Sequence, residues 1–220
     1  MFEDIHCEYV DHMGDDLRVA NAARVSMGKW KDEFDHKDAK LLGYLSEHNH
    51  WTPFAHAVVT LRETVPIFIA RQRFKHTVGF VYNEVSRRYV DTPPTFYRPT
   101  EWRGRAENVK QGSSDEVIHD LTYNGELVDI HTIYERTAKY AMLAYNTFLE
   151  SGVAPEQARM VLPQSMMTTY IVTGSLYAWA RAYGLRKDSH AQKEIQTLAD
   201  QWNNIISPLF PCAWKELVNA

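Results

Sequence analysis

Residues 55–76, AHAVVTLRETVPIFIARQRFKH, contain a strand pattern that leads directly into a helix pattern. Apolar residues alternate around Val58, Val59 and Leu61, which predicts a strand over 55–64. Pro66 stands where a helix can begin, because its missing N–H costs nothing in the first turn. The residues that follow have helical spacing, so a helix is predicted over 66–76, with Gly79 as its breaker.

The rest of the chain mixes the two element types without a regular βαβ rhythm. Helices are predicted over 15–26, 38–48, 134–151, 155–161, 176–185 and 190–206, with a short one after Pro211, and a second strand is predicted over 166–172. Residues 49–53 read as a turn or loop. This order favours an α+β fold over a doubly wound one, with a mixed or antiparallel sheet packed by helices.

Length and composition indicate one domain over residues 1–220. With 45% hydrophobic residues, the chain has enough apolar surface for one core, and it should bury about 70% of its unfolded surface. Residues 91–133 are rich in Pro and Gly and predict a long irregular excursion with one helical stretch. Loops of this length are usually functional or mobile, so the excursion is interpreted as a lid or a contact to another subunit.

Charge and targeting signals narrow the class of protein further. The net charge of -4 argues against non-specific nucleic-acid binding by the whole surface, so an anion site must be a local cluster of cations. The N-terminus is acidic and the apolar runs fall far short of the ~20 residues of a membrane span, which predicts a soluble protein without a signal peptide. Cys7 and Cys212 form no CxxC pair, which fits a reducing cytoplasm.

Two neighbouring segments, residues 71–77 and 83–89, concentrate Arg and Lys around a single carboxylate, Glu84. Arg71 and Lys75 are four apart and are expected on one helical face. Arg forks can neutralise a phosphate, while nearby amide and hydroxyl groups can read the edge of uracil. The alternative is a solvated basic helix face, which a single such segment would favour.

Two other segments have simpler interpretations when taken alone. Glu156 and Arg159 are three apart on a predicted helix, where a minor salt bridge is the better interpretation. His48, His50 and His56 crowd one loop, but HExxH and CxxC spacings are lacking and a proline interrupts the segment. These histidines are expected to line a ligand pocket, and no metal site is predicted.

Arg186 is expected at a junction between helices. Gly184 is predicted to end one helix, and Asp188 or Ser189 to cap the next. Arg186 then either caps backbone carbonyls or reaches into a cleft as a fixed positive charge. The sequence supports both equally.

These four segments, in this order and spacing, resemble the flavin-dependent thymidylate synthases, known as ThyX, from about Val19 to Ile195. The family signature is Arg-His-Arg, seven residues and Ser, with Asn-Glu just before that Ser and Arg-Tyr just after it. Here residues 75–77 read Lys-His-Thr, and eight residues separate Thr77 from Ser86. Two replacements and one insertion therefore depart from the pattern, and the variant resembles phage and viral members.

The other three of these four segments also carry the resemblance. Residues 156–163, EQARMVLP, resemble the family's ExAR-x-VLP helix, and residues 185–195 resemble its LRxxxxAQxEI stretch. Residues 50–56, HWTPFAH, are similar to its HxTPFxH loop. One such motif is weak evidence, but the ordered set is specific.

The resemblance implies roles for particular residues. The dUMP contacts would be Gln72, Ser86, Arg87, Arg88, Arg159 and Arg186, with arginines on the phosphate. The FAD contacts would be His50, Thr52, Lys75, His76 and Glu84, and also Ser175 and Arg181, where the residue types differ from the family's. Arg186 would be catalytic, because a guanidinium at the uracil edge stabilises negative charge on the ring.

The resemblance also implies an activity and its partners. The reaction would be reductive methylation of dUMP to dTMP, with methylenetetrahydrofolate as carbon donor, reduced FAD as hydride donor and NADPH as reductant. The enzyme would be a cytoplasmic homotetramer with active sites at subunit interfaces and with no nucleic-acid or membrane partner. The chain has no GxGxxG motif, which agrees with a flavin site built without a Rossmann turn.

Two rival functions make different predictions. A nucleotide- or RNA-binding module using the same basic segments would be colourless and salt-sensitive. A cysteine-dependent methyltransferase would need a thiolate nucleophile, for instance Cys212. Both cysteines lie outside the four segments, so packing roles are expected for them.

Overall fold

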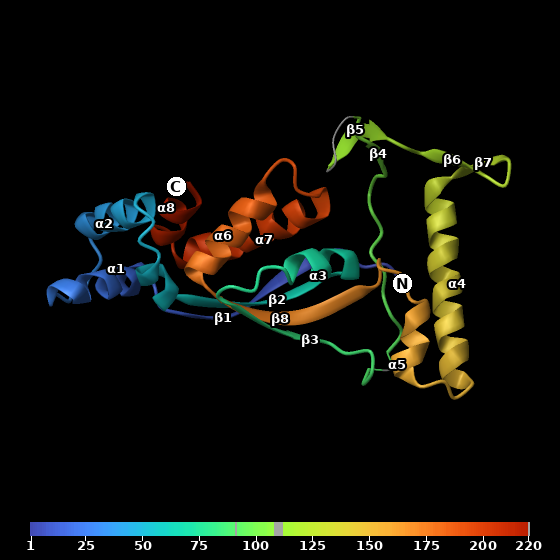
Figure 1. Cartoon of the computed structure of the whole chain (residues 1–220), viewed down its shortest axis with the longest axis horizontal. Helices are drawn as coiled ribbons and strands as arrows, with labels where there is room; N and C mark the ends of the chain where they lie inside the picture. The colour runs from blue at the N-terminus through green and yellow to red at the C-terminus, as the bar shows by residue number, and fades with distance from the viewer. Residues whose placement is uncertain (91, 108–111, 220) are drawn as a thin grey trace. The chain divides into compact units, whose positions relative to one another are not determined.

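The computed structural model describes residues 1–90, 92–107 and 112–219 (Figure 1). The strands are β1 (His6–Met13), β2 (Val58–Pro66), β3 (Phe80–Glu84), β4 (Arg103–Arg105), β5 (Ser113–Val117), β6 (Asp120–Tyr123), β7 (Glu126–Asp129) and β8 (Met167–Ser175). The α-helices are α1 (Asp16–Arg24), α2 (His36–Glu47), α3 (Ile67–Arg73), α4 (Ile130–Glu150), α5 (Pro155–Ala158), α6 (Leu176–Lys187), α7 (Lys193–Leu209) and α8 (Ala213–Asn219). Short 3-10 helices are η1 (Val25–Met27), η2 (Thr52–His56) and η3 (Arg159–Val161). The predicted α+β fold is confirmed.

Contacts divide the chain into two compact units. Unit 1 comprises Met1–Ile5, Thr64–Arg71 and Glu84–Thr169, and unit 2 comprises His6–Glu63, Gln72–Asn83 and Tyr170–Ala220. The largest sheet has the strand order β1-β2-β8-β3. Two further sheets are antiparallel pairs, β4 with β5 and β6 with β7.

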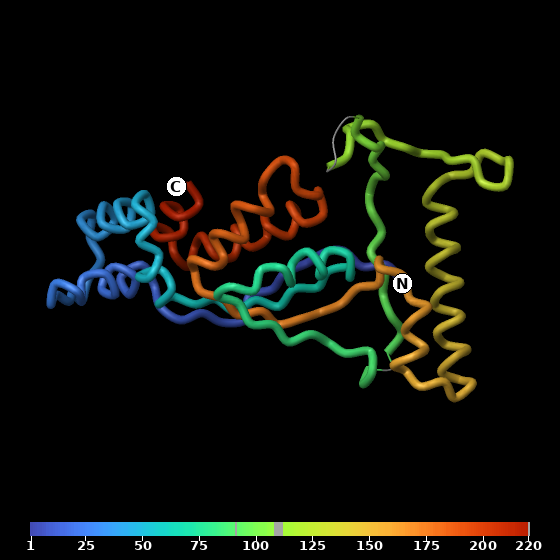
Figure 2. Tube along the Cα trace, in the orientation of Figure 1, coloured from blue at the N-terminus to red at the C-terminus, as the bar shows by residue number. Residues whose placement is uncertain are grey.

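Unit 2 is built around a tryptophan-rich core. Trp179 of α6 and Trp202 of α7 are fully buried, and their rings meet edge-on at 5.5 Å. Trp179 Nε1 donates a hydrogen bond to the Val59 carbonyl of β2 at 3.1 Å, which fixes α6 against the sheet. Helix α8 packs beside α2 (Figures 1 and 2), where Ser46 Oγ donates to the Glu216 carbonyl at 3.0 Å.

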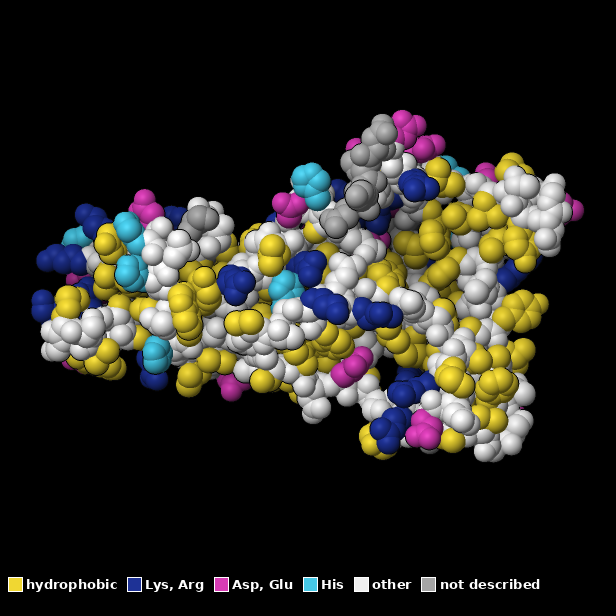
Figure 3. Space-filling model, in the orientation of Figure 1, with side chains coloured by type: hydrophobic (Ala, Val, Ile, Leu, Met, Phe, Trp, Pro, Cys, Tyr) yellow, Lys and Arg dark blue, Asp and Glu magenta, His cyan; other side chains and the backbone are white. Residues whose placement is uncertain are grey.

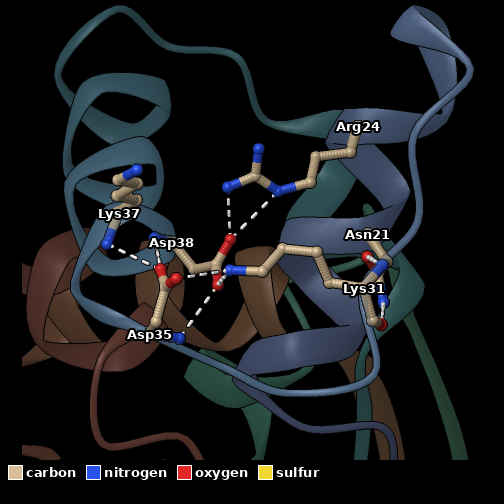
Figure 4. A network of polar contacts seen from close by, with 6 residues as sticks. All are labelled: Asn21, Arg24, Lys31, Asp35, Lys37 and Asp38. Carbon is tan, nitrogen blue, oxygen red and sulfur yellow. Dashed lines mark hydrogen bonds and ion pairs between the residues drawn. The ribbon is translucent and has the colours of Figure 1, made fainter.

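A charged cluster holds the α1–α2 region of unit 2 together (Figure 4). The Asp38 side chain is fully buried and accepts from Arg24 and, at 2.5 Å, from Lys31 Nζ. Asp38 also accepts from the Asp35 backbone N–H, while the Asp35 side chain accepts from the Asp38 N–H, which completes a capping box at the start of α2. The cluster therefore connects the end of α1, the loop after it and the first turn of α2.

Unit 1 is organised around the long helix α4. A small core is formed by Ala138 of α4 together with Phe96 and Met166. Asp129 caps its start by accepting from the Thr132 N–H at 2.8 Å, and Gly152, with φ +83°, follows its end. Hydrophobic side chains lie uncovered over α4 (Figure 3), and the exposed ones include Tyr140 and Leu143. Across the described residues, no helix is both long and apolar enough to cross a membrane.

The predicted helices over 15–26, 38–48, 134–151, 155–161 and 176–185 and the strand over 166–172 are confirmed, and α8 matches the short helix expected after Pro211. The strand predicted over 55–64 begins only at Val58, because residues 52–56 form η2, and it continues to Pro66. Pro66 is thus the last residue of β2 and does not open the helix. Helix α3 stops at Arg73 instead of reaching residue 76, and the Tyr82 hydroxyl donates to the His76 carbonyl in the turn that follows.

Several other expectations were wrong. Strands β1 and β3 were not predicted, and region 91–133 contains β4 to β7 where one helical stretch was expected. Helix α4 begins at Ile130, earlier than expected. Gly184 lies inside α6, and α7 begins after Gln192 without a side-chain cap, so neither Asp188 nor Ser189 caps it.

Candidate functional site

Arg186, the predicted catalytic residue, lies in the last turn of α6 and not in the loop that follows it. Its Nε donates to His76 Nε2 at 2.8 Å, and its Nη2 donates to the Gln72 carbonyl at 3.2 Å. Both partners belong to α3 or to the turn after it. The half-buried guanidinium is therefore held in one orientation by another element, and its bond to the Gln72 carbonyl is the carbonyl-capping role that the sequence allowed.

His76 accepts from Arg186 because its ring stays neutral. Burial lowers the pKa of His76 to about 4, and the charges of Arg186, Arg73 and Arg181 add to this effect. Burial, and then the charge of Arg73, also lowers the pKa of Arg186. A guanidinium remains protonated in proteins, so the pair at neutral pH is a cation beside a neutral imidazole.

Gln72 and Lys75, from the first basic segment, lie in unit 2 near Arg186 or at the end of α3. Gln72 Nε2 donates to Gln192 Oε1 at 2.6 Å, which connects α3 to the residue before α7. Lys75 is exposed and follows the end of α3 at Arg73. The expected shared helical face of Arg71 and Lys75 is therefore wrong, because the helix has ended before Lys75.

A pocket in unit 2 adjoins the predicted flavin loop. Its cavity measures about 280 Å³, and its lining includes Glu47, Asn49, Trp51, Tyr177 and Arg181. The Trp51 and Tyr177 rings lie 5.8 Å apart, and Arg181 Cζ lies 6.0 Å from the Tyr177 ring. The pocket thus combines aromatic faces with one cation, a combination that suits a planar anionic ligand. Sequence reasoning missed Trp51 and Tyr177, although Trp51 stands inside the quoted HWTPFAH loop.

The other predicted flavin contacts of unit 2 occupy exposed or capping positions. His50 and Thr52 are exposed at the loop that leads into η2. The Ser175 hydroxyl accepts from the Ala178 N–H at 3.2 Å and so caps α6. His48 stacks on Tyr44 at 4.1 Å, and its Nδ1 lies 2.9 Å from the Tyr44 carbonyl.

In unit 1, two of the predicted phosphate-binding arginines converge on Glu156. Arg88 Nε lies 3.8 Å from a Glu156 carboxylate oxygen, and Arg159 Nε donates to the Glu156 carbonyl at 3.2 Å. The salt bridge favoured between Glu156 and Arg159 is therefore wrong, since the carboxylate faces Arg88. Two exposed arginines thus contact the same residue of α5, one through its carboxylate and one through its backbone carbonyl.

The rest of the second basic segment is tied to its own surroundings in unit 1. Glu84 accepts from Thr168 Oγ1 at 2.6 Å, and the Ser86 hydroxyl accepts from the Arg88 N–H at 3.3 Å. Arg87 Nη1 donates to the Thr92 carbonyl. The predicted site residues therefore form two groups, one in each unit, and their convergence on one nucleotide remains a prediction.

The two thiols are poorly suited to nucleophilic attack. Burial, and then the charge of Glu63, raises the pKa of Cys7. Burial raises the pKa of Cys212 to about 11, and Asp16 and Glu216 add to this effect. A thiol attacks as the thiolate, so both environments work against a cysteine mechanism.

Sequence reasoning also missed a fully buried ion pair beside Arg186's partners. Arg73 at the end of α3 and Glu63 of β2 have side chains that are 0% exposed, and Arg73 Nε lies 3.2 Å from both Glu63 oxygens. No spacing signal identifies such a pair, because Glu63 belongs to a strand and Arg73 to a segment that reads as a basic surface. Only the fold brings the two together.

Comparisons with known proteins identify the family of this chain. The family model described as "Thymidylate synthase complementing protein" matches residues 8–212. A flavin-dependent thymidylate synthase of Thermosipho africanus is 39% identical over 93% of this chain and 86% of that protein. One from Thermus thermophilus is 35% identical over 93% of this chain and 72% of that protein.

A solved structure has the same fold. The UMP/dUMP methylase PolB from Streptomyces cacaoi, bound with 5-Br dUMP, superposes with a TM-score of 0.83 and 29% identity. The match covers 99% of this chain and 96% of that one. Motifs, fold and relatives agree, and the chain belongs to the flavin-dependent thymidylate synthase family.

Proposed function

We propose that this protein methylates C5 of the uracil of dUMP to give dTMP, without a cysteine nucleophile. The relatives' names and the 5-Br dUMP bound to PolB support this substrate. The observation that carries the proposal is the orientation of Arg186, whose guanidinium is held at 2.8 Å by a neutral His76 and at 3.2 Å by the Gln72 carbonyl. A fixed cation of this kind can stabilise negative charge on a pyrimidine ring.

The residues divide the work on dUMP between them. Arg186 would face the uracil edge, where its N–H groups stabilise the enolate-like form that makes C5 nucleophilic. Arg88 and Arg159, which already lie around Glu156, would neutralise the phosphate with Arg87. Gln72 and Ser86 complete the proposed dUMP contacts.

The residues in and beside the unit 2 pocket support FAD as the cofactor. The pocket of about 280 Å³ offers Trp51 and Tyr177 as ring faces and Arg181 as a cation, beside the exposed His50 and Thr52. The remaining proposed flavin contacts are Lys75, His76, Glu84 and Ser175. When bound, reduced FAD would supply the hydride, with methylenetetrahydrofolate as the carbon donor and NADPH as the reductant.

We further propose that residues 1–220 act as one catalytic domain in a cytoplasmic homotetramer, with active sites at subunit interfaces. The uncovered apolar side chains of α4 support assembly, since exposed apolar patches usually mark contact surfaces. The partners would be dUMP, folate and NADPH, with no nucleic acid and no membrane.

The test is tritium release from [5-³H]dUMP by Arg186→Ala protein that still carries flavin. We expect the rate to fall by about 10²–10³-fold, as for the loss of one preorganised charge contact. Arg18→Ala, which removes an exposed helix arginine of α1 in the same unit as Arg186, is the matched control and should retain wild-type turnover. Near-normal release by Arg186→Ala would remove Arg186 from the mechanism.

The absorbance spectrum separates this proposal from the binding-module alternative. The purified protein should be yellow, and its flavin bands should shift when dUMP is added. A colourless protein that binds RNA in a salt-dependent manner would instead support a nucleic-acid role.

A further inference from the structure

A buried network in unit 2 begins at Glu63 and ends at the turn after α3. Glu63 accepts from Arg73 Nε at 3.2 Å and from the Tyr170 hydroxyl at 2.5 Å. Arg73 Nη1 donates to the Tyr82 hydroxyl at 2.5 Å. These four side chains come from β2, α3, β8 and β3, so the network joins three strands to one helix end.

The guanidinium of Arg73 has little freedom to move. Its Cζ lies between 4.5 and 5.2 Å from four ring centroids, those of Phe80, Tyr82, Trp179 and Trp202. Cation–π attraction and the Glu63 carboxylate together compensate for the loss of water. Packed among these rings and bonded through Nε and Nη1, the Arg73 guanidinium is a fixed point from which Tyr82 is held.

Tyr82 transmits this position to the turn. Its hydroxyl donates to the His76 carbonyl at 2.7 Å, and the Arg73 carbonyl lies at 3.3 Å as a second acceptor. The Arg73 carbonyl also accepts from the His76 backbone N–H at 3.1 Å, so the Tyr82 hydroxyl adds a side-chain contact to a turn that already has a backbone hydrogen bond. A side chain that bonds the carbonyls at a helix end helps to fix how the chain leaves the helix. Here the chain leaves α3 so that the His76 ring faces Arg186.

We propose that Tyr82 is a positioning residue for Arg186, acting through the turn that carries His76. The network of Glu63, Arg73 and Tyr82 places the His76 imidazole at the Nε of Arg186, and the Gln72 carbonyl at its Nη2. The inference rests on the proposed role of Arg186 and adds how that guanidinium is oriented. Neither Tyr82 nor Arg73 needs to touch the substrate.

Removing the hydroxyl should misplace Arg186 without emptying the core. In Tyr82→Phe the ring remains to pack against Phe74 at 5.1 Å, while the His76 carbonyl and Arg73 Nη1 each lose a partner. The turn then relaxes, and Arg186 loses the fixed acceptor that holds its Nε. A small misplacement of a catalytic group lowers the rate of the chemical step strongly, whereas dUMP can still bind through its other contacts.

The first measurement is steady-state kinetics of Tyr82→Phe. We expect kcat to fall by about 10- to 100-fold, the scale seen when supporting partners of metal ligands are lost, with KM for dUMP changed far less. Tyr183→Phe is the matched control, because this half-buried tyrosine of α6 packs against Trp214 outside the network. The control should keep wild-type kcat.

The second measurement is the pH dependence of kcat, which a merely structural defect would not move. Burial keeps the pKa of His76 at about 4, and three nearby positive charges add to this effect, namely Arg186 and Arg181 of α6 and Arg73 of α3. Protonation of His76 removes the acceptor of Arg186, so the wild-type rate should fall only near that pH. In Tyr82→Phe the less tightly held His76 should titrate closer to its ordinary pKa. The acid limb of the pH profile, which is the pH range in which kcat falls on acidification, should therefore lie at higher pH than in the wild type.

The outcomes separate this inference from the proposed function. If Tyr82→Phe melts normally and matches Tyr183→Phe in both kcat and acid limb, the positioning role is overturned. Arg73→Lys, which keeps the charge but loses the guanidinium fork, provides a second variant and should move the limb in the same direction. If Arg186→Ala itself turns over normally, the proposed catalytic role fails, whatever Tyr82→Phe shows.

Discussion

At the scale of single residues, the environment of each group decides which chemistry it can perform. Cys7 and Cys212 have raised thiol pKa values, chiefly because of burial, and His76 has a lowered one for the same reason. Burial disfavours whichever form carries charge. The thiols therefore stay protonated, and the imidazole stays neutral beside Arg186.

The cysteines give a direct prediction. A thiol with a pKa of about 11, such as Cys212, has only about one thiolate in 10⁴ molecules at pH 7, too few for an efficient nucleophile. We expect the Cys7→Ala/Cys212→Ala double variant to convert dUMP at the wild-type rate per folded, flavin-loaded subunit. Complete loss of turnover with normal flavin loading would instead support a cysteine mechanism.

At the scale of elements, the Asp38 cluster shows how one carboxylate holds two helices. Burial alone would raise the pKa of Asp38, but hydrogen bonds from Lys31, the Asp35 backbone and Arg24 hold it below its ordinary value. A depressed folded-state pKa means that the unfolded chain binds the proton more readily. The resulting stability is present above the unfolded pKa of about 4 and is lost as the pH falls through the folded pKa.

Asp38→Asn should therefore destabilise the protein in a pH-dependent way. At pH 7 we expect a loss of about 1.5–3 kcal/mol, the range for a hydrogen bond to a charged group. The difference from wild type should shrink below about pH 4, where the wild-type carboxylate also becomes protonated. Urea melts at both pH values measure this, with the exposed Asp32→Asn as control. An equal destabilisation at both pH values would contradict the linkage.

Elements with long amphipathic periods were predictable, and short exposed ones were not. Helices α2 and α4 carry apolar residues at helical spacing and begin at aspartate caps. Strands β4 to β7 span only three to five residues and are mostly exposed, so they show no clear alternation. One signal was present, because Asn124 and Gly125 both have positive φ in the turn from β6 to β7, as an Asn-Gly hairpin requires.

At the scale of the whole molecule, motif order predicted the family, while the fold alone revealed the network behind Arg186. The motifs contain the residues that are proposed to contact the ligands. The proposed positioning network is formed by Glu63, Arg73 and Tyr82. These side chains contact one another only because of the way β2, β3 and α3 pack. The ends of α3 and α6 also depend on tertiary contacts, which is why Arg186 was expected beyond its helix.

The two groups of site residues suggest a test of shared active sites. Arg88 and Arg159 belong to unit 1, whereas Gln72 and Arg186 belong to unit 2. If different subunits supply the two groups, mixing inactive Arg88→Ala and Arg186→Ala proteins restores intact sites. Random reassembly should recover about a quarter of wild-type turnover.

Reassembly of the two variants after mild dissociation, followed by tritium release, measures this recovery. Each variant reassembled with itself is the control and should stay inactive. No recovery from a mixture shown by mass spectrometry to contain both chains would place both arginines of each site on one subunit.

The salt bridge of Arg73 with Glu63 also limits how this sequence can change over time. Replacing either partner alone leaves the other charge stranded in the core, whereas a concerted exchange for two well-packed apolar residues can be neutral or stabilising. Descendants of this chain should therefore keep both residues or lose both together. Those that lose both must find another way to orient the histidine that faces Arg186.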